Sequence, residues 1–231
     1  MKFAAFETST EWCSVALWLD GELSGIEELA GQRHSDRVLP MLDLLTARAG
    51  VPLASLDAVA FGAGPGSFTG LRIACGVAQG IAFARGIPVI GVSTLEAMAA
   101  ESGASRVVAC LDARMGEVYF SAYERMEGDS VDAWREVTAA QCVAPSVVAP
   151  PAGEGWIGCG NGFAAYGNLG FATVLAEVHA SAISIARLAA PRLAAGEGVD
   201  ASLALPIYVR DKVAFTEAER AEVRAASRAV P

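Results

Sequence analysis

Residues 64–73 read GPGSFTGLRI, and this stretch organises the N-terminal half of the chain. A short apolar run, residues 56–62, precedes it and predicts a buried strand. Residues 69–85 follow it as a long helical pattern that ends at Gly86 and Pro88. Glycine supplies the positive φ angles that a tight strand-to-helix turn needs, whereas a helix N-terminus with free N–H groups can hold an anion. No Gly-Lys-Ser/Thr follows, which excludes a Walker loop, and both interpretations stay open at this point.

The predicted helix 69–85 carries two rows of small residues with a four-residue period. One row is Gly70, Ala74, Ala78 and Ala82, and the other is Gly76, Gly80 and Ala84. Small residues at this spacing let a second element approach closely, and a glycine inside a helix costs about 1 kcal/mol relative to alanine. Packing on the domain's own sheet explains one row. The second row predicts contact with a partner.

The segments before this helix predict a meander and a second helix. Residues 2–8, 13–19 and 22–29 read as three antiparallel strands, with a hairpin turn at Asp20-Gly21. Ser35 is the candidate N-cap of a helix over residues 35–49. Its apolar face, formed by Val38, Leu42 and Leu45, is predicted to share the partner surface.

A second unit repeats the order of the first. Strands are predicted at residues 106–112, 117–123 and 156–162, and a helix at 184–195. Two α/β units with mixed sheets are therefore expected. We place the first lobe at residues 1–103 and a smaller second lobe at 104–212, with a C-terminal helix within 213–231 packing back on the first lobe.

Composition limits the classes of function. The chain has 231 residues, a hydrophobic fraction of 53% and a net charge of −9. Lysine occurs only at Lys2 and Lys212, so the basic face of a protein that grips nucleic acid unaided is missing. The N-terminus lacks the apolar run of a signal peptide. Five scattered cysteines without a CxxC pair indicate reduced thiols in the cytoplasm.

Three turns contain residues suited to phosphate or metal contact, at residues 7–10, 112–114 and 158–162. Turns use such residues for structural reasons as well. The candidate contacts are Glu7, Thr8, Ser9, Asp112, Arg114, Gly160 and Asn161. His34 and His179 are isolated and read as satisfied structural side chains, so no metal site and no catalytic triad is predicted.

Residues 64–73 closely resemble the hallmark of the TsaB (YeaZ) family. Three further segments agree in the family's order: residues 7–10 with 14–17, 111–114 with 117–119, and 205–210. The resemblance covers most of the chain. It implies an actin-like ATPase fold of two ribonuclease-H-like lobes, the second of them reduced.

The resemblance also implies a function. Members of the family support a TsaD transferase and a TsaE ATPase that place threonylcarbamoyl on the adenosine 3′ of the anticodon in tRNAs reading ANN codons. The chain is then a non-catalytic dimer partner of TsaD, a homodimer in isolation, and contacts tRNA only through the complex. No cofactor is expected in the isolated chain, and ATP or ADP is expected at the complex interface.

The family pairs through its first two helices, here residues 35–49 and 69–85. This resemblance and the small-residue rows together predict one interface. Its expected residues are Val38, Leu42, Leu45, Gly70, Arg72, Ile73, Ala74, Val77, Ala78 and Ile81.

Three positions argue against catalysis by this chain. TsaD holds its metal with a His-x-x-x-His pair, and the matching positions here are Thr94 and Met98. A hydroxyl and a thioether do not replace two imidazoles. The first turn usually bears Asp in the family, and Glu7 stands there. The alternative is an independent actin-like ATP-dependent phosphotransferase or an M22-like peptidase, which would need a competent carboxylate and a nucleotide or metal site.

Overall fold

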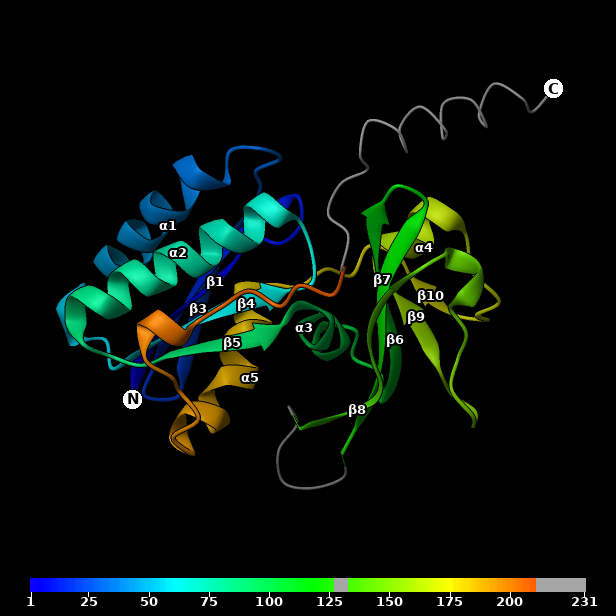
Figure 1. Ribbon diagram of the computed structural model, residues 1–231. Coiled ribbons are helices and arrows are strands. Elements are labelled where there is room, and N and C mark those ends of the chain that lie inside the picture. The colour runs from blue at the N-terminus through cyan, green and yellow to red at the C-terminus, as the bar shows by residue number, and fades with distance from the viewer. Residues whose placement is uncertain (127–132, 211–231) are drawn as a thin grey trace.

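Two five-stranded mixed sheets, one from each half of the chain, form the framework (Figure 1). The computed structural model describes residues 1–126 and 133–210. The first sheet has the order β3-β2-β1-β4-β5. Its strands are β1 (Lys2–Glu7), β2 (Trp12–Leu19), β3 (Glu22–Leu29), β4 (Ala58–Gly64) and β5 (Val89–Ser93). The predicted meander and the strand predicted at residues 56–62 are confirmed, with end points that differ by a few residues.

The second sheet repeats the pairing of the first. Its order is β10-β9-β6-β7-β8. The neighbours β6-β7 and β7-β8 pair antiparallel, whereas β6-β9 and β9-β10 pair parallel, as β1-β4 and β4-β5 do. The strands are β6 (Arg106–Arg114), β7 (Glu117–Arg125), β8 (Trp134–Val143), β9 (Ile157–Cys159) and β10 (Val174–Leu175). The expected duplication is therefore confirmed by topology, although no sequence repeat reveals it.

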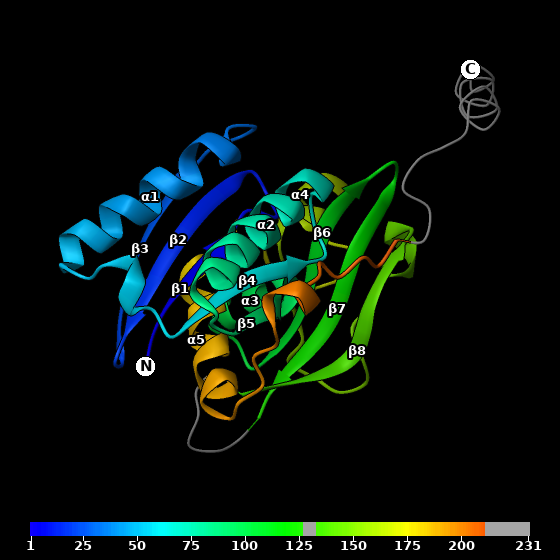
Figure 2. The same ribbon diagram turned by 60° about the vertical axis from the view of Figure 1, so that its left-hand side comes forward.

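Helices cover the first sheet on both faces (Figure 2). α1 (His34–Ala49) and α2 (Phe68–Arg85) pack on one face, over a core that includes Phe6, Val59 and Phe61. α3 (Thr94–Glu101) and α5 (Ala182–Ala194) lie between the two sheets. α4 (Asn161–Tyr166) packs on β6 at the outer face of the second sheet. Single 3-10 turns lie at Leu53–Ser55, Pro145–Val147 and Ala201–Leu203.

The second lobe is the smaller one, as predicted. The long helix α1 of the first lobe connects β3 to β4, and the equivalent connection from β8 to β9 holds only the turn Pro145–Val147. The actin-like arrangement of two ribonuclease-H-like lobes is thus confirmed.

The last helix of each lobe crosses to the other sheet. α3 follows β5 but also packs on β6 and β7, and α5 follows β10 but packs on β1, β2 and β4. Val199 pairs with Val89, and the Ile207 N–H donates to the Ala63 carbonyl at 2.7 Å. The prediction that residues 104–212 form the second lobe is therefore corrected, because residues 182–207 pack on the first. The predicted helix within 213–231 lies outside the described residues.

The two helix starts differ in their capping. Ser67 caps α2 and accepts a hydrogen bond from the Gly70 N–H, although α2 begins one residue before the prediction. Ser35 does not cap α1, which begins at His34. His34 is buried and its ring bonds to the Trp12 carbonyl, which holds the first turn in place. None of the described helices combines the length and apolarity needed to cross a membrane.

Candidate functional site

The stretch 64–70 packs directly on the turn between β1 and β2. The Thr8 hydroxyl donates to the Gly70 carbonyl at 2.7 Å, and the Ser67 N–H donates to the Ser9 carbonyl at 2.7 Å. A Cβ at Gly70 would lie 1.8 Å from the Thr8 oxygen, and one at Gly66 would lie 2.7 Å from the Ser9 carbonyl oxygen. These two glycines thus permit a close approach of backbones, and Gly64 supplies the positive φ, 107°. Packing within the chain accounts for the glycine pattern.

Glu7 points inward from this turn. Its side chain is fully buried, and its carboxylate accepts from the Ser9 N–H at 2.5 Å and from the Thr94 hydroxyl at 3.4 Å. A Cβ at Gly62 would lie 1.8 Å from the same carboxylate, so the neighbouring strand is shaped around it. Burial raises the pKa of Glu7 above its ordinary value. The carboxyl group is therefore a core group and not an exposed ligand.

The second predicted turn closes on itself. Asp112 accepts from the Arg114 N–H at 2.9 Å and from the Tyr166 hydroxyl at 3.2 Å, and its second oxygen lies 3.2 Å from the Arg114 guanidinium. Asn161 accepts from the Asp112 N–H at 2.9 Å and so joins the start of α4 to this turn. Gly160 packs against Met98 and the Cys110 carbonyl. The carboxylate of Asp112 thus already has three partners within the chain.

A cleft of about 670 Å³ lies between the two lobes. Four of the seven predicted nucleotide contacts line it: Ser9, Asp112, Arg114 and Asn161. The other three are buried or packed behind its wall: Glu7, Thr8 and Gly160. The structure therefore brings the three predicted turns to one cleft. Many of their polar groups, however, already form hydrogen bonds with other residues of the chain.

One wall of this cleft is formed by a segment for which no site role was predicted. We call residues 204–210 the strap, because they run from the first lobe to the second (Figure 1). Ile207 bonds to Ala63 in the first lobe, and Arg210 donates to Glu117 of β7 at 2.6 Å in the second. Ile207, Tyr208 and Arg210 line the cleft. The aromatic and cationic residues of the motif 205–210 were the feature of the sequence that could have indicated this role.

Comparisons with known proteins agree with this architecture. A family model described as TsaD, tRNA N6-adenosine threonylcarbamoyltransferase, matches residues 26–206. The tRNA threonylcarbamoyladenosine biosynthesis protein TsaB of Escherichia coli K12 is 38% identical over 228 residues, which cover 93% of this chain and 97% of that protein. The chain belongs to the TsaB (YeaZ) family. The TsaB of Haemophilus influenzae is 48% identical over 149 residues, 61% of this chain and 63% of that protein.

A solved structure of the same family superposes over nearly the whole chain. YeaZ from Pseudomonas aeruginosa is 40% identical, with a TM-score of 0.84 over 90% of this chain and 99% of that one. The fold and the family predicted from residues 64–73 are therefore confirmed.

The predicted interface residues of this TsaB-family chain divide into two groups. Six of them are buried in the first lobe, where they pack on its sheet: Val38, Leu42, Leu45, Gly70, Ala74 and Ala78. Their assignment to an exposed docking surface is corrected, because the larger side chains and the inward row of α2 form the lobe's own core. The remaining four are exposed or half-buried: Arg72, Ile73, Val77 and Ile81.

The second small-residue row of α2 faces outward. Gly76, Gly80 and Ala84 are exposed, and a Cβ at either glycine would meet nothing within 4 Å. Phe83, which the sequence analysis missed, lies beside this row with 81% of its surface exposed. One row thus packs on the sheet and the other faces outward, and the contact of this second row with a partner stays a prediction.

The histidines and the positions that match the TsaD metal ligands are structural. His34 bonds to the Trp12 carbonyl, and His179 stacks on Trp12 and contacts Glu27 at 3.0 Å. Thr94 and Met98 are both fully buried. Among residues 1–126 and 133–210, no group of three or more His, Cys, Asp or Glu side chains could hold a metal ion.

Proposed function

We propose that this chain is a non-catalytic subunit that pairs with a TsaD-like transferase and supports threonylcarbamoyl transfer to the adenosine 3′ of the anticodon in tRNAs reading ANN codons. A TsaE-like ATPase would act in the same complex. The family places the chain in tRNA threonylcarbamoyladenosine modification. One observation supports the non-catalytic part of this proposal: the turn 7–10, which holds three of the candidate phosphate contacts, packs against the chain's own residues 66–70.

The interior of the chain supports a non-catalytic role. Glu7 directs its carboxylate toward Gly62 and Thr94, and Thr8 directs its hydroxyl to Gly70. Thr94 and Met98 stand where the catalytic relative has its metal-binding histidines, and both are buried. We therefore propose that the isolated chain holds no nucleotide or metal and that ATP or ADP enters only at the complex interface.

The outward surface of α1 and α2 supports pairing. Phe83 and Leu39 are 81% and 48% exposed, and Gly76 and Gly80 leave a smooth surface between longer side chains. Exposed aromatic side chains such as Phe83 are enriched at protein interfaces. In isolation the same surface would pair with a second copy of the chain.

An independent phosphotransferase or peptidase has less support. Such an enzyme would need a carboxylate that is open to the cleft, and Asp112 is the nearest candidate. Its oxygens are engaged by the Arg114 N–H, the Arg114 guanidinium and the Tyr166 hydroxyl.

A reconstituted modification assay tests the proposal. The TsaD-like and TsaE-like proteins of the same organism are combined with a threonylcarbamoyl donor, ATP and substrate tRNA, with and without this chain. We expect modified adenosine only when the chain is present, and no turnover of ATP or peptide by the chain alone. Equal modification without the chain, or turnover by the chain alone, would contradict the proposal.

A further inference from the structure

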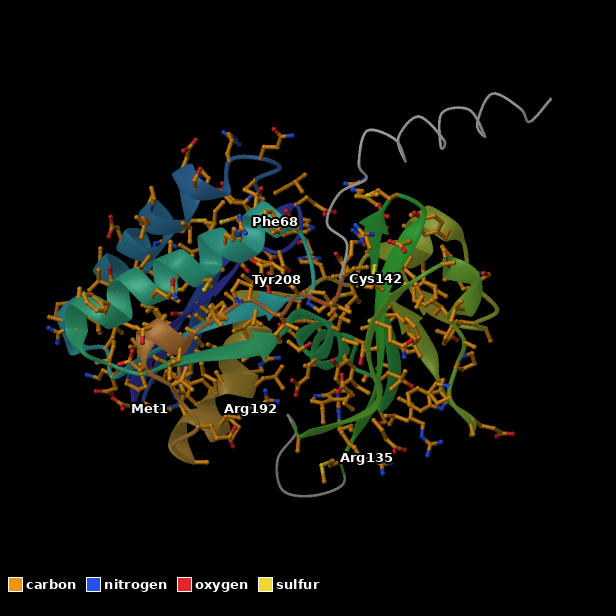
Figure 3. All side chains as sticks on the ribbon, viewed as in Figure 1. Met1, Phe68, Arg135, Cys142, Arg192 and Tyr208 are labelled. Atoms are coloured by element: carbon orange, nitrogen blue, oxygen red, sulfur yellow. The ribbon has the colours of Figure 1, made fainter. Side chains whose placement is uncertain are left out.

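Phe68 and Tyr208, both labelled in Figure 3, form an exposed cluster with Arg72 where α2 begins. The Arg72 guanidinium stacks on the Phe68 ring with its carbon 3.7 Å from the ring centroid. Its Nε donates to the Tyr208 hydroxyl at 3.2 Å, and the Phe68 and Tyr208 rings lie 5.8 Å apart. Phe68 and Tyr208 are 41% and 50% exposed, and Arg72 is also exposed. The cluster therefore fixes a guanidinium at the surface.

Among the described residues, the two terminal nitrogens of this guanidinium have no partner. The ion pairs among residues 1–126 and 133–210 do not include Arg72, and its hydrogen bond there uses Nε. α2 carries only two charged residues, Arg72 and Arg85, and both are cationic. A guanidinium held flat with its Nη edge free is the geometry that binds a carboxylate through two parallel hydrogen bonds.

We infer that the cluster of Phe68, Arg72 and Tyr208 receives a carboxylate of the TsaD-like transferase and anchors that end of the interface. This inference rests on the proposed function. Arg72 binds the carboxylate, Phe68 supports the guanidinium plane, and Tyr208 is a positioning residue that acts through Nε of Arg72. Arginine and aromatic residues dominate the energetically important centres of protein interfaces.

The position of Arg72 favours a protein carboxylate over a phosphate in the cleft. Phe68 and Tyr208 line the cleft, but Arg72 does not and lies at its outer rim. From there α2 continues into the exposed surface of Gly76, Gly80 and Phe83. The net charge of −9 also opposes the approach of a polyanion to the chain as a whole.

Affinity measurements with matched charge deletions test the inference. The full-length chain and its variants Arg72→Gln, Arg72→Lys and Arg187→Gln are titrated with the purified transferase at low and high salt. Arg187 is the control, because it is an exposed arginine of α5, on the face of the first sheet opposite α2, and its removal changes the net charge equally. We expect Arg72→Gln to raise Kd about tenfold or more, to flatten the salt dependence, and to leave the thermal midpoint unchanged. Arg72→Lys should recover only part of the affinity.

Tyr208→Phe separates positioning from a structural role. It should weaken binding less than Arg72→Gln, and its effect should disappear in the Arg72→Gln background. Unchanged affinity of Arg72→Gln, or an equal loss for Arg187→Gln, would overturn the inference while leaving the proposed function intact. Failure of the unmodified chain to bind the transferase would instead contradict the proposed function.

Discussion

Gly70 and Gly76 lie on the same helix in opposite surroundings. A Cβ at Gly70 would lie 1.8 Å from the backbone oxygen of Thr8, whereas one at Gly76 would meet nothing within 4 Å. The same residue type therefore serves a close approach at one position and an open surface at the other. In the sequence both positions appear only as small residues of a four-residue repeat, so the sequence does not distinguish their surroundings.

The two alanine variants should change stability in opposite directions. We expect Gly70→Ala to lower the free energy of unfolding by about 1–3 kcal/mol, because the added methyl group would overlap the Thr8 backbone and force it to move. Gly76→Ala should raise it by about 0.5–1 kcal/mol, since alanine restricts the unfolded chain and favours the helix. Urea unfolding of both variants measures the difference. Equal effects of the two substitutions would contradict the packing of the turn 7–10 on α2.

Glu7 makes the free energy of unfolding depend on pH. Burial raises its pKa above the ordinary value of 4.5, so the folded chain keeps a proton that the unfolded chain releases. The contribution of Glu7 to stability is then full below that ordinary value and is lost as pH rises toward the raised pKa.

The neutral variant Glu7→Gln should lack this loss. We expect its free energy of unfolding to improve relative to the unmodified chain by about 1.4 kcal/mol per pH unit within that window. Urea titrations at about pH 5 and about pH 8 provide the comparison. A constant difference between the two chains across pH would show that Glu7 has no raised pKa.

At the scale of elements, α2 has two faces with separate functions. The inward row packs on β4, and Ala74, Ala78 and Ala82 are fully buried there. The outward row is open and belongs to the proposed interface. Both rows have a four-residue period in the sequence, so the period shows that two faces exist without showing which one is buried.

Charged substitutions on the two faces should therefore have different consequences. Ala78→Asp should destabilise the chain by about 4 kcal/mol or more, because it buries an unpaired charge in the lobe core. Gly80→Arg should leave the thermal midpoint within a few degrees of the unmodified value and abolish co-purification with the transferase. If Gly80→Arg still co-purifies at the normal ratio, the outward face is not the interface.

The whole molecule is held together across the lobe boundary. α3 and α5 lie between the sheets in one core that includes Leu95, Met98 and Leu188, and the strap bonds to both lobes. The cleft between the lobes is lined by groups that already have partners, among them Asp112 and Asn161. This internal pairing is the physical basis for expecting weak nucleotide binding.

Calorimetry with ATP and Mg²⁺ tests that expectation on the isolated chain. We expect no saturable heat at ligand concentrations up to about 1 mM, which corresponds to a binding free energy weaker than about −4 kcal/mol. Binding in the micromolar range would show that the cleft opens and that the nucleotide role cannot be assigned to the complex interface alone.

The amino-acid sequence by itself determined the order and type of the main strands and helices, the family, and the two small-residue rows of α2. These features depend on local signals: periodicity, glycine and proline at element ends, and the motif 64–73. The sequence did not predict α4 or β10, and the strand predicted at residues 156–162 ends at Cys159. Only the tertiary structure decided that Val38, Leu42 and Ala74 are core, that α5 crosses to the first sheet, and that the strap brings Tyr208 to Arg72. The reason is physical, because burial and the pairing of polar groups depend on contacts between residues far apart in the chain, which no local pattern contains.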